Sequence, residues 1–204
     1  MRYCVAVFLL IANVTYGQWE ADIMAGVAGY KGDLTQKQFM FRTFRPATNI
    51  NIRYNYDNNF VVRAGITWAA VSGNDRFNSQ PDLRARNLRF LSQVVEGSLC
   101  IEYNLLEPEI FYAYPYVFAG VGVFHFNPYS FDDKGKKTYL RNLSTEGQGL
   151  ADYPDRKPYS LTQLCIPFGA GWKVNLNDRM DIVYEVGFRV LFTDYLDDVS
   201  TTFI

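Results

Sequence analysis

The chain has 204 residues, a formal net charge of −1 and a single histidine. A near-neutral chain offers no basic surface of the kind that nucleic acids require, so a nucleic-acid partner is not expected. Apolar residues make up 49% of the chain, but polar residues interrupt them before any run reaches the ~18 residues of a membrane helix. Any part that spans a membrane must therefore be built from strands.

The N-terminus has the features of a targeting segment. Arg2 supplies a positive charge, Val5 to Ala12 forms a short apolar core, and Thr15-Tyr16-Gly17 ends on a small residue as a cleavage site requires. We therefore predict that residues 1–17 are a signal peptide for export through the general secretory pathway. The alternative is a short buried strand or helix at the terminus.

After residue 17, apolar and polar residues alternate strictly in seven runs, which is the pattern of half-buried strands. The runs are longer than the ~5–6 residues of a typical soluble strand and suit the ~9–11 residues of a membrane-crossing one. Several end in aromatic residues, which is typical of the girdles at a membrane interface. The runs are Trp19–Tyr30, Thr48–Tyr56, Phe60–Val71, Phe90–Leu105, Tyr116–Phe126, Tyr159–Leu176 and Met180–Phe192, and the aromatic ends include Trp19, Tyr30, Tyr54, Tyr56, Tyr103, Tyr116 and Phe126.

Short and long connections alternate along the chain. Asp57–Asn59 and Asn177–Arg179 read as tight turns, and Glu107–Pro115 as a moderate link. If the strands run up and down, all short connections lie at one end and all long ones at the other, as in outer-membrane barrels. The long polar connections are Lys31–Ala47, Ser72–Arg89 and Asn127–Pro158.

These features predict an all-β fold: an up-and-down, antiparallel transmembrane β-barrel of eight-stranded design, formed by residues 18–204. Only seven strands are visible, whereas bacterial single-chain barrels have an even number. An eighth strand is needed because lipid cannot satisfy an open strand edge. The residues after Phe192 are mostly polar, so we expect the last strand to be missing through C-terminal truncation. A partner chain or a rearranged closure are the alternatives.

If the apolar faces contact lipid, the polar faces line the lumen and place ten charged residues inside it. An eight-stranded barrel is just wide enough for side chains to fill, and isolated buried charges are costly, so these groups should pair. We therefore predict a structural salt-bridge plug, with an ion path or a catalytic cluster as the alternative. The predicted lumen residues are Glu20, Asp22, Arg53, Arg63, Glu96, Glu102, Lys173, Asp181, Glu185 and Arg189.

No catalytic, cofactor or metal site is predicted. His125 has no acidic or serine partner that the sequence can place beside it. The acidic loop residues lack the spacing of a calcium-binding hand, and solvated loop acids are the simpler interpretation. They are Asp132, Asp133, Asp194, Asp197 and Asp198. Cys100 and Cys165 share the lumen face at different heights, so we expect two free thiols.

Short sequence words, in a fixed order, resemble the PorG-like outer-membrane barrel family of Bacteroidota over nearly all of the chain after residue 17. They are YKGDL (30–34), FRPA (44–47), YPY (114–116) with FAGVGVFHFNP (118–128), EGQGL (146–150), IPFG (166–169) and FTDYLDDVS (192–200). The resemblance implies an eight-stranded barrel associated with type IX secretion, contacts with a periplasmic ring of the PorK and PorN type, and no catalysis or cofactor. The chain departs from the family by ending where a last strand would follow.

The leading hypothesis is a non-enzymatic outer-membrane barrel that anchors or positions a secretion assembly. Its expected partners are outer-membrane lipids and, by resemblance, the periplasmic ring proteins; no small-molecule substrate is evident. The first alternative is an OmpA-like protein with a structural or adhesive role in the envelope, using its long loops. The second is a soluble lipocalin-like binder, because alternation by itself does not say which face is inside.

Overall fold

The computed structural model describes residues 3–16, 18–31, 43–74, 89–131, 135–143, 159–177 and 180–193. Most of these residues lie in strands. Within these ranges no helix is both long and apolar enough to cross a membrane. The elements are β1 (Tyr3–Tyr16), β2 (Trp19–Lys31), β3 (Arg45–Asn55), β4 (Phe60–Asn74), β5 (Arg89–Asn104), β6 (Ala113–Phe131), β7 (Lys137–Tyr139), the 3-10 helix η3 (Leu140–Leu143), β8 (Thr162–Asn177) and β9 (Met180–Leu191).

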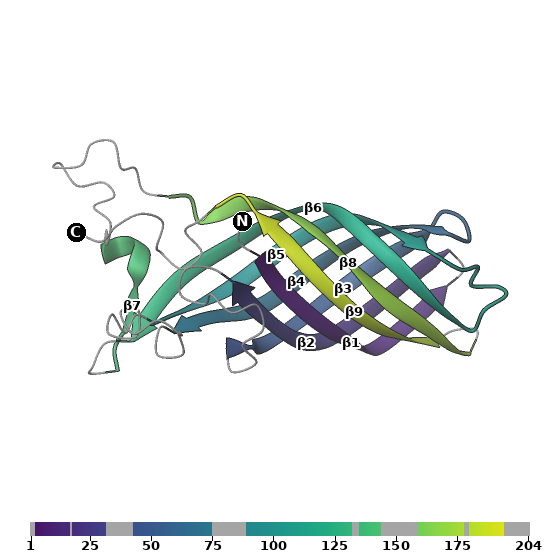
Figure 1. The fold of residues 1–204 in the computed structure, drawn as a ribbon, viewed down its shortest axis with the longest axis horizontal. Helices are drawn as coiled ribbons and strands as arrows, with labels where there is room; N and C mark the ends of the chain where they lie inside the picture. The colour runs from purple at the N-terminus through teal and green to yellow at the C-terminus, as the bar shows by residue number, and fades with distance from the viewer. Residues whose placement is uncertain are drawn as a thin grey trace.

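Eight long strands form a closed antiparallel barrel (Figure 1). Consecutive strands pair with one another from β1 to β6, β8 continues from β6, and β9 pairs back to β1. The short strand β7 adds to the far end of β6, where Lys137 pairs with Phe131. Closure leaves every barrel strand with two neighbours, which is how a sheet satisfies its backbone groups without water. The predicted fold class is confirmed.

The eighth strand of the described barrel comes from the N-terminal segment. Residues 3–16 form β1, which lies between β2 and β9, the two edges that the seven predicted strands leave open. The count of seven strands is therefore one short, because the N-terminal segment supplies the eighth. The C-terminal truncation stays a prediction. Sequence reasoning failed here because an apolar run without alternation fits a signal core and a two-sided apolar strand equally well. Removal of residues 1–17 on export stays a prediction, and it would take β1 out of the described barrel.

Period-two alternation sorts the side chains of the barrel into an apolar outer face and a mainly polar lumen. On β5, Leu99 and Ile101 are 54% and 60% exposed, whereas Cys100 and Glu102 between and beside them are buried. Described side chains of β1 break this rule, because Ala6 and Phe8 bring apolar groups to the inside. The lumen is thus charged over most strands and apolar beside β1.

The strands are strongly staggered around the barrel. Beginning at Tyr16 of β1, the cross-strand partners run through Trp19, Tyr54, Val62, Ile101, Ala119, Phe168 and Phe188. The circuit returns to β1 at Val5, near the opposite end of the strand. A stagger of this kind accompanies strongly tilted strands, which Figure 1 shows. Residues far apart in sequence therefore meet at one level of the lumen.

The two ends of the barrel differ, as the alternation of connections predicted. The connections β1–β2, β3–β4, β5–β6 and β8–β9 are short and share one end, which we call the turn end. Aromatic pairs line its outer surface: the ring centroids of Trp19 and Tyr54 are 4.8 Å apart, and those of Phe60 and Tyr103 are 4.9 Å apart. At the opposite end β6 and β7 project beyond the barrel (Figure 1).

Three aromatic residues predicted for the interfacial girdle lie inside instead. Tyr30, Tyr116 and Phe126 are buried and belong to the core cluster. The phase of β6 explains two of them, because its even-numbered positions face inward while Val117, Val121 and Val123 face out. Aromatic residues near a strand end indicate a girdle only when the phase places them outside.

Candidate functional site

The centre of the lumen is organised around Glu102. Arg53 of β3 and Arg63 of β4 lie directly opposite each other, an arrangement of like charges that is unfavourable without a counter-charge. The Glu102 carboxylate from β5 supplies it: Oε1 lies 3.1 Å from Arg53 Nε and 2.8 Å from Arg63 Nη1. Lys173 Nζ of β8 approaches the other carboxylate oxygen at 3.3 Å. One buried anion thus links three cations from three strands.

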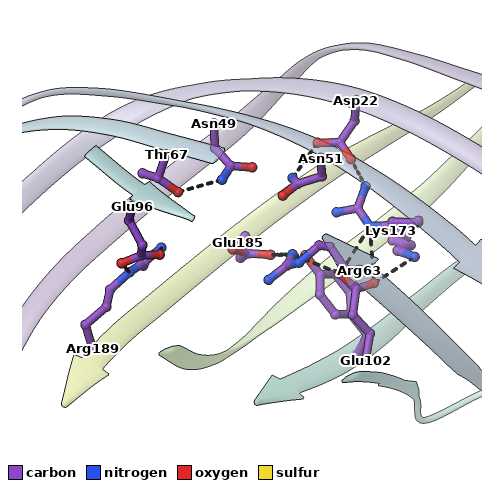
Figure 2. Close-up of polar contacts among 12 residues, drawn as sticks. Asp22, Asn49, Asn51, Arg63, Thr67, Glu96, Glu102, Lys173, Glu185 and Arg189 are labelled. Atoms are coloured by element: carbon purple, nitrogen blue, oxygen red, sulfur yellow. Dashed lines mark hydrogen bonds and ion pairs between the residues drawn. The ribbon is translucent and has the colours of Figure 1, made fainter. Parts of the chain in front are cut away.

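Two further carboxylates complete the central network (Figure 2). Asp22 of β2 pairs with the Arg53 guanidinium and accepts a 2.8 Å hydrogen bond from Asn51 Nδ2. Glu185 of β9 accepts a 2.5 Å hydrogen bond from Arg63 Nη1. Three anions therefore balance three cations in the middle of the barrel, and this balance is what buried charges require.

A second, smaller ion pair lies apart from the central network in Figure 2. Arg189 of β9 donates from Nε and Nη2 to the two carboxylate oxygens of Glu96, at 3.2 and 3.3 Å. The Cys165 thiol donates to the same carboxylate at 3.6 Å. This pair lies on the side of the lumen toward the long connections, so buried ion pairs occupy the lumen at two levels.

The remaining two predicted lumen residues lie near the turn end. Glu20 is buried at the start of β2 and accepts a 2.6 Å hydrogen bond from Asn55 Nδ2. Asp181 is half-buried at the start of β9. The structure thus places all ten predicted residues on the lumen phase and joins eight of them in the two ion-paired groups.

Sequence reasoning missed the aromatic part of the plug. The Tyr116 hydroxyl donates to Glu185 at 2.7 Å, and the Lys173 ammonium lies 5.2 Å from the centre of the Tyr116 ring. The Arg63 guanidinium lies 4.3 Å from the centre of the Phe118 ring. Cation–π contacts of this geometry add to the stabilisation of desolvated cations. The available signal was the phase of β6, which puts Tyr116 and Phe118 on the inner face.

Glycines on the lumen face make room for these large side chains. A Cβ built on Gly171 would lie 2.5 Å from the Tyr116 hydroxyl oxygen, so any larger residue there would displace that ring. A Cβ on Gly187 would lie 2.9 Å from Arg189 Nη1. Glycine in a strand often marks close approach of another group, and here that group is the plug.

Cys100 and Cys165 are free thiols, as predicted, and both are buried. They flank β6, where Cys100 pairs with Gly120 and Cys165 with Gly122. Two inter-strand spacings of ~4.8 Å separate their strands, which exceeds the ~7 Å reach of a disulfide between Cα atoms. The intervening strand, rather than a large difference in height, keeps them apart.

His125 lies on the outer face of β6 and is exposed, with Nδ1 3.0 Å from Thr162 Oγ1. Among the described residues, no group of three or more histidine, cysteine, aspartate or glutamate side chains could hold a metal ion. The loop acids Asp132, Asp133 and Asp194 lie outside the described residues. Among the described residues, the charged and hydrogen-bonding side chains are therefore concentrated in the lumen, where the charges within each ion-paired group neutralise one another.

No curated protein matches the chain. Among solved structures, the chain is similar to Ail, the attachment invasion locus protein of Yersinia pestis, crystallised in complex with the heparin analogue sucrose octasulfate. The two are 11% identical, with a TM-score of 0.34, over 94% of this chain and 98% of that chain. The family described as "Domain of unknown function (DUF6089)" matches residues 1–202, and the chain therefore belongs to the DUF6089 family.

Proposed function

We propose that this chain is a non-enzymatic outer-membrane barrel that anchors or positions a protein secretion assembly of type IX through contacts at its periplasmic end. The observation that carries the proposal is the charge-paired lumen, in which Glu102 and its three cations lie buried in the middle of the barrel. Because the lumen charges pair with one another and the outer face is apolar, the rims are where we expect specific contacts. The resemblance to PorG-like barrels supports the secretion assembly as the partner.

A lipid environment is supported by the outer face. Bulky apolar residues are exposed on all eight barrel strands, for example Leu9, Ile23, Leu99, Val121 and Leu164. Soluble monomers rarely expose continuous apolar patches beyond a few hundred Å². A polar lumen with an apolar exterior is the arrangement of outer-membrane barrels, and it is the reverse of a soluble lipocalin-like binder. In such barrels short turns face the periplasm, so we assign the turn end to that side.

Leu99→Arg tests the membrane-embedded face. Leu99 is 54% exposed on β5, and an arginine there would place a charge in the lipid, which costs ~2–4 kcal/mol near the bilayer midplane. We expect that loss in the free energy of unfolding of the full chain in lipid vesicles, measured by denaturant titration. Leu143→Arg is the matched control, since Leu143 is 55% exposed in η3 beyond the barrel and should tolerate the charge. Equal, small effects at both positions would argue against lipid at β5.

The anchoring role is tested by isolation from the native envelope. A tagged full chain should co-purify in mild detergent with periplasmic ring proteins of the PorK and PorN type, and deletion of its gene should reduce secretion. Isolation as a lone barrel, with secretion unchanged in the deletion strain, would contradict the proposal.

A second candidate is an adhesive or structural role in the envelope. The observation that favours it is the β6–β7 hairpin beyond the barrel, where Phe131 and Tyr139 are exposed. The Lys137 ammonium lies 3.8 Å from the centre of the Tyr129 ring, a cation–π contact between the two strands of the hairpin. Loss of cell-surface binding on trimming residues 127–158, with secretion intact, would favour this role.

A further inference from the structure

The link between β5 and β6, residues 105–112, forms an exposed apolar tip at the turn end. Ile110 is 69% exposed and Tyr112 is 76% exposed, and Leu105, Leu106 and Phe111 are exposed beside them. In Figure 1 this link extends beyond the other turns at the right of the barrel. Apolar side chains grouped at the end of a barrel, past the ends of its strands, indicate an interaction surface.

Hydrogen bonds hold this tip in one conformation. The backbone N–H groups of Ile110 and Phe111 both donate to the Glu107 carbonyl, at 3.1 and 3.0 Å. The tip is fastened to β8 by a 2.7 Å bond from the Asn175 N–H to the Tyr112 carbonyl. A surface that is already ordered loses less conformational entropy when a partner binds.

The neighbouring β3–β4 turn enlarges the surface. Asn104 N–H donates to the Asn59 carbonyl at 2.8 Å, and Asn59 Nδ2 donates back to the Asn104 carbonyl at 2.8 Å. These bonds place the two turns side by side, so Tyr56, which is 74% exposed, belongs to the same end surface. Exposed tyrosines are the residue type that protein interfaces favour.

Within the β3–β4 and β5–β6 turns, the charges beside the tip all have one sign. Asp57, Glu107 and Glu109 are exposed, and residues 56–59 and 105–112 contain no lysine or arginine. Three carboxylates beside the apolar side chains disfavour insertion of the tip into a membrane surface that carries anionic lipids. They favour a partner whose binding surface is basic at its rim.

We propose that this tip docks a periplasmic protein that offers an apolar pocket for Ile110 and Tyr112 and basic side chains for Glu107 and Glu109. This inference rests on the proposed function, which places the turn end in the periplasm. It adds the contact surface and the chemistry of the partner. A lipid surface is the competing occupant, and the experiment separates the two.

The test uses the full chain in intact cells, with a photoreactive phenylalanine derivative in place of Tyr112. The matched control carries the same derivative in place of Tyr184, an exposed tyrosine on the outer face of β9. Irradiation should link position 112 to a protein segment containing lysine or arginine, identified by mass spectrometry, and position 184 to lipid alone. Ile110→Ser should lower the yield of the protein adduct about tenfold, and Glu107→Lys with Glu109→Lys several-fold.

The folding of each variant is checked by the heat-modifiable gel mobility of the barrel. Substitutions at exposed turn positions should leave its stability unchanged. Lipid adducts at position 112 would overturn the inference. A protein adduct whose yield is unchanged by both sets of substitutions would overturn it as well. Normal secretion in the Ile110→Ser strain, together with reduced secretion in the deletion strain, would overturn the docking role of the tip and leave the proposed function standing. Normal secretion in the deletion strain would overturn the proposed function, while the adducts at position 112 would still decide what the tip binds.

Discussion

A chain that begins at Gln18 should fail to form a closed barrel by itself, whereas the full chain should form one. Without β1, β2 loses the partner that pairs with it from Trp19 to Lys31, and β9 loses its partner along most of its length. Each unsatisfied backbone group exposed to lipid costs several kcal/mol. The loss of a whole strand therefore exceeds the total stability of a typical domain, ~5–15 kcal/mol.

Refolding into detergent micelles, followed by heat-modifiable gel mobility, measures this directly. The compact, heat-sensitive band should appear for residues 1–204 and be absent for residues 18–204. A synthetic peptide of residues 3–16 added to the shorter chain should restore part of the compact band, because it can pair between β2 and β9. A compact band from residues 18–204 alone would mean that the N-terminal segment acts as a leader and is dispensable for closure.

Glu102→Ala should lower the free energy of unfolding by ~3–5 kcal/mol, the effect of breaking a buried ion pair by removing one partner. The substitution would leave Arg53, Arg63 and Lys173 near one another without the anion that links them. Denaturant titration of the full chain in micelles, followed by tryptophan fluorescence, provides the measurement.

Two controls separate charge from side-chain volume in that experiment. Glu102→Gln keeps the shape of the side chain but removes its charge, so it should also destabilise the barrel, through the uncompensated cations. Glu107→Ala removes a glutamate that is exposed in the β5–β6 link and should leave the unfolding transition unchanged. If Glu102→Ala behaves like Glu107→Ala, the central network does not contribute to stability.

Alternation predicted which side chains enter the lumen but not which of them pair. Asn49, Asn51 and Arg53 follow one another at every second position, so their common face could be read directly from the sequence. The alternation does not reveal that Glu102 pairs with three cations while Glu96 pairs with Arg189. The choice depends on the stagger of the closed barrel, which sums the registers of all eight strand pairs.

The N-terminal segment marks the clearest limit of local sequence reasoning. Its uninterrupted apolar run, from Val5 to Ala12, carries no period that would distinguish a strand from a signal core. Seven strands leave two edges open, on β2 and β9, but only the closed barrel shows that this segment pairs with both of them. Tyr116 is a similar case, because its place in the plug follows from the phase of β6 and the space beside Gly171.

By itself, the sequence determined the fold class, the sorting of short and long connections, and the charged character of the lumen, because each follows from a period of two residues or from the length of a connection. The tertiary structure alone decided the identity of the closing strand, the pairing of the buried charges and the inward orientation of the Tyr30, Tyr116 and Phe126 side chains. These features depend on contacts between strands that are distant in the chain, and such contacts are fixed only when the barrel closes.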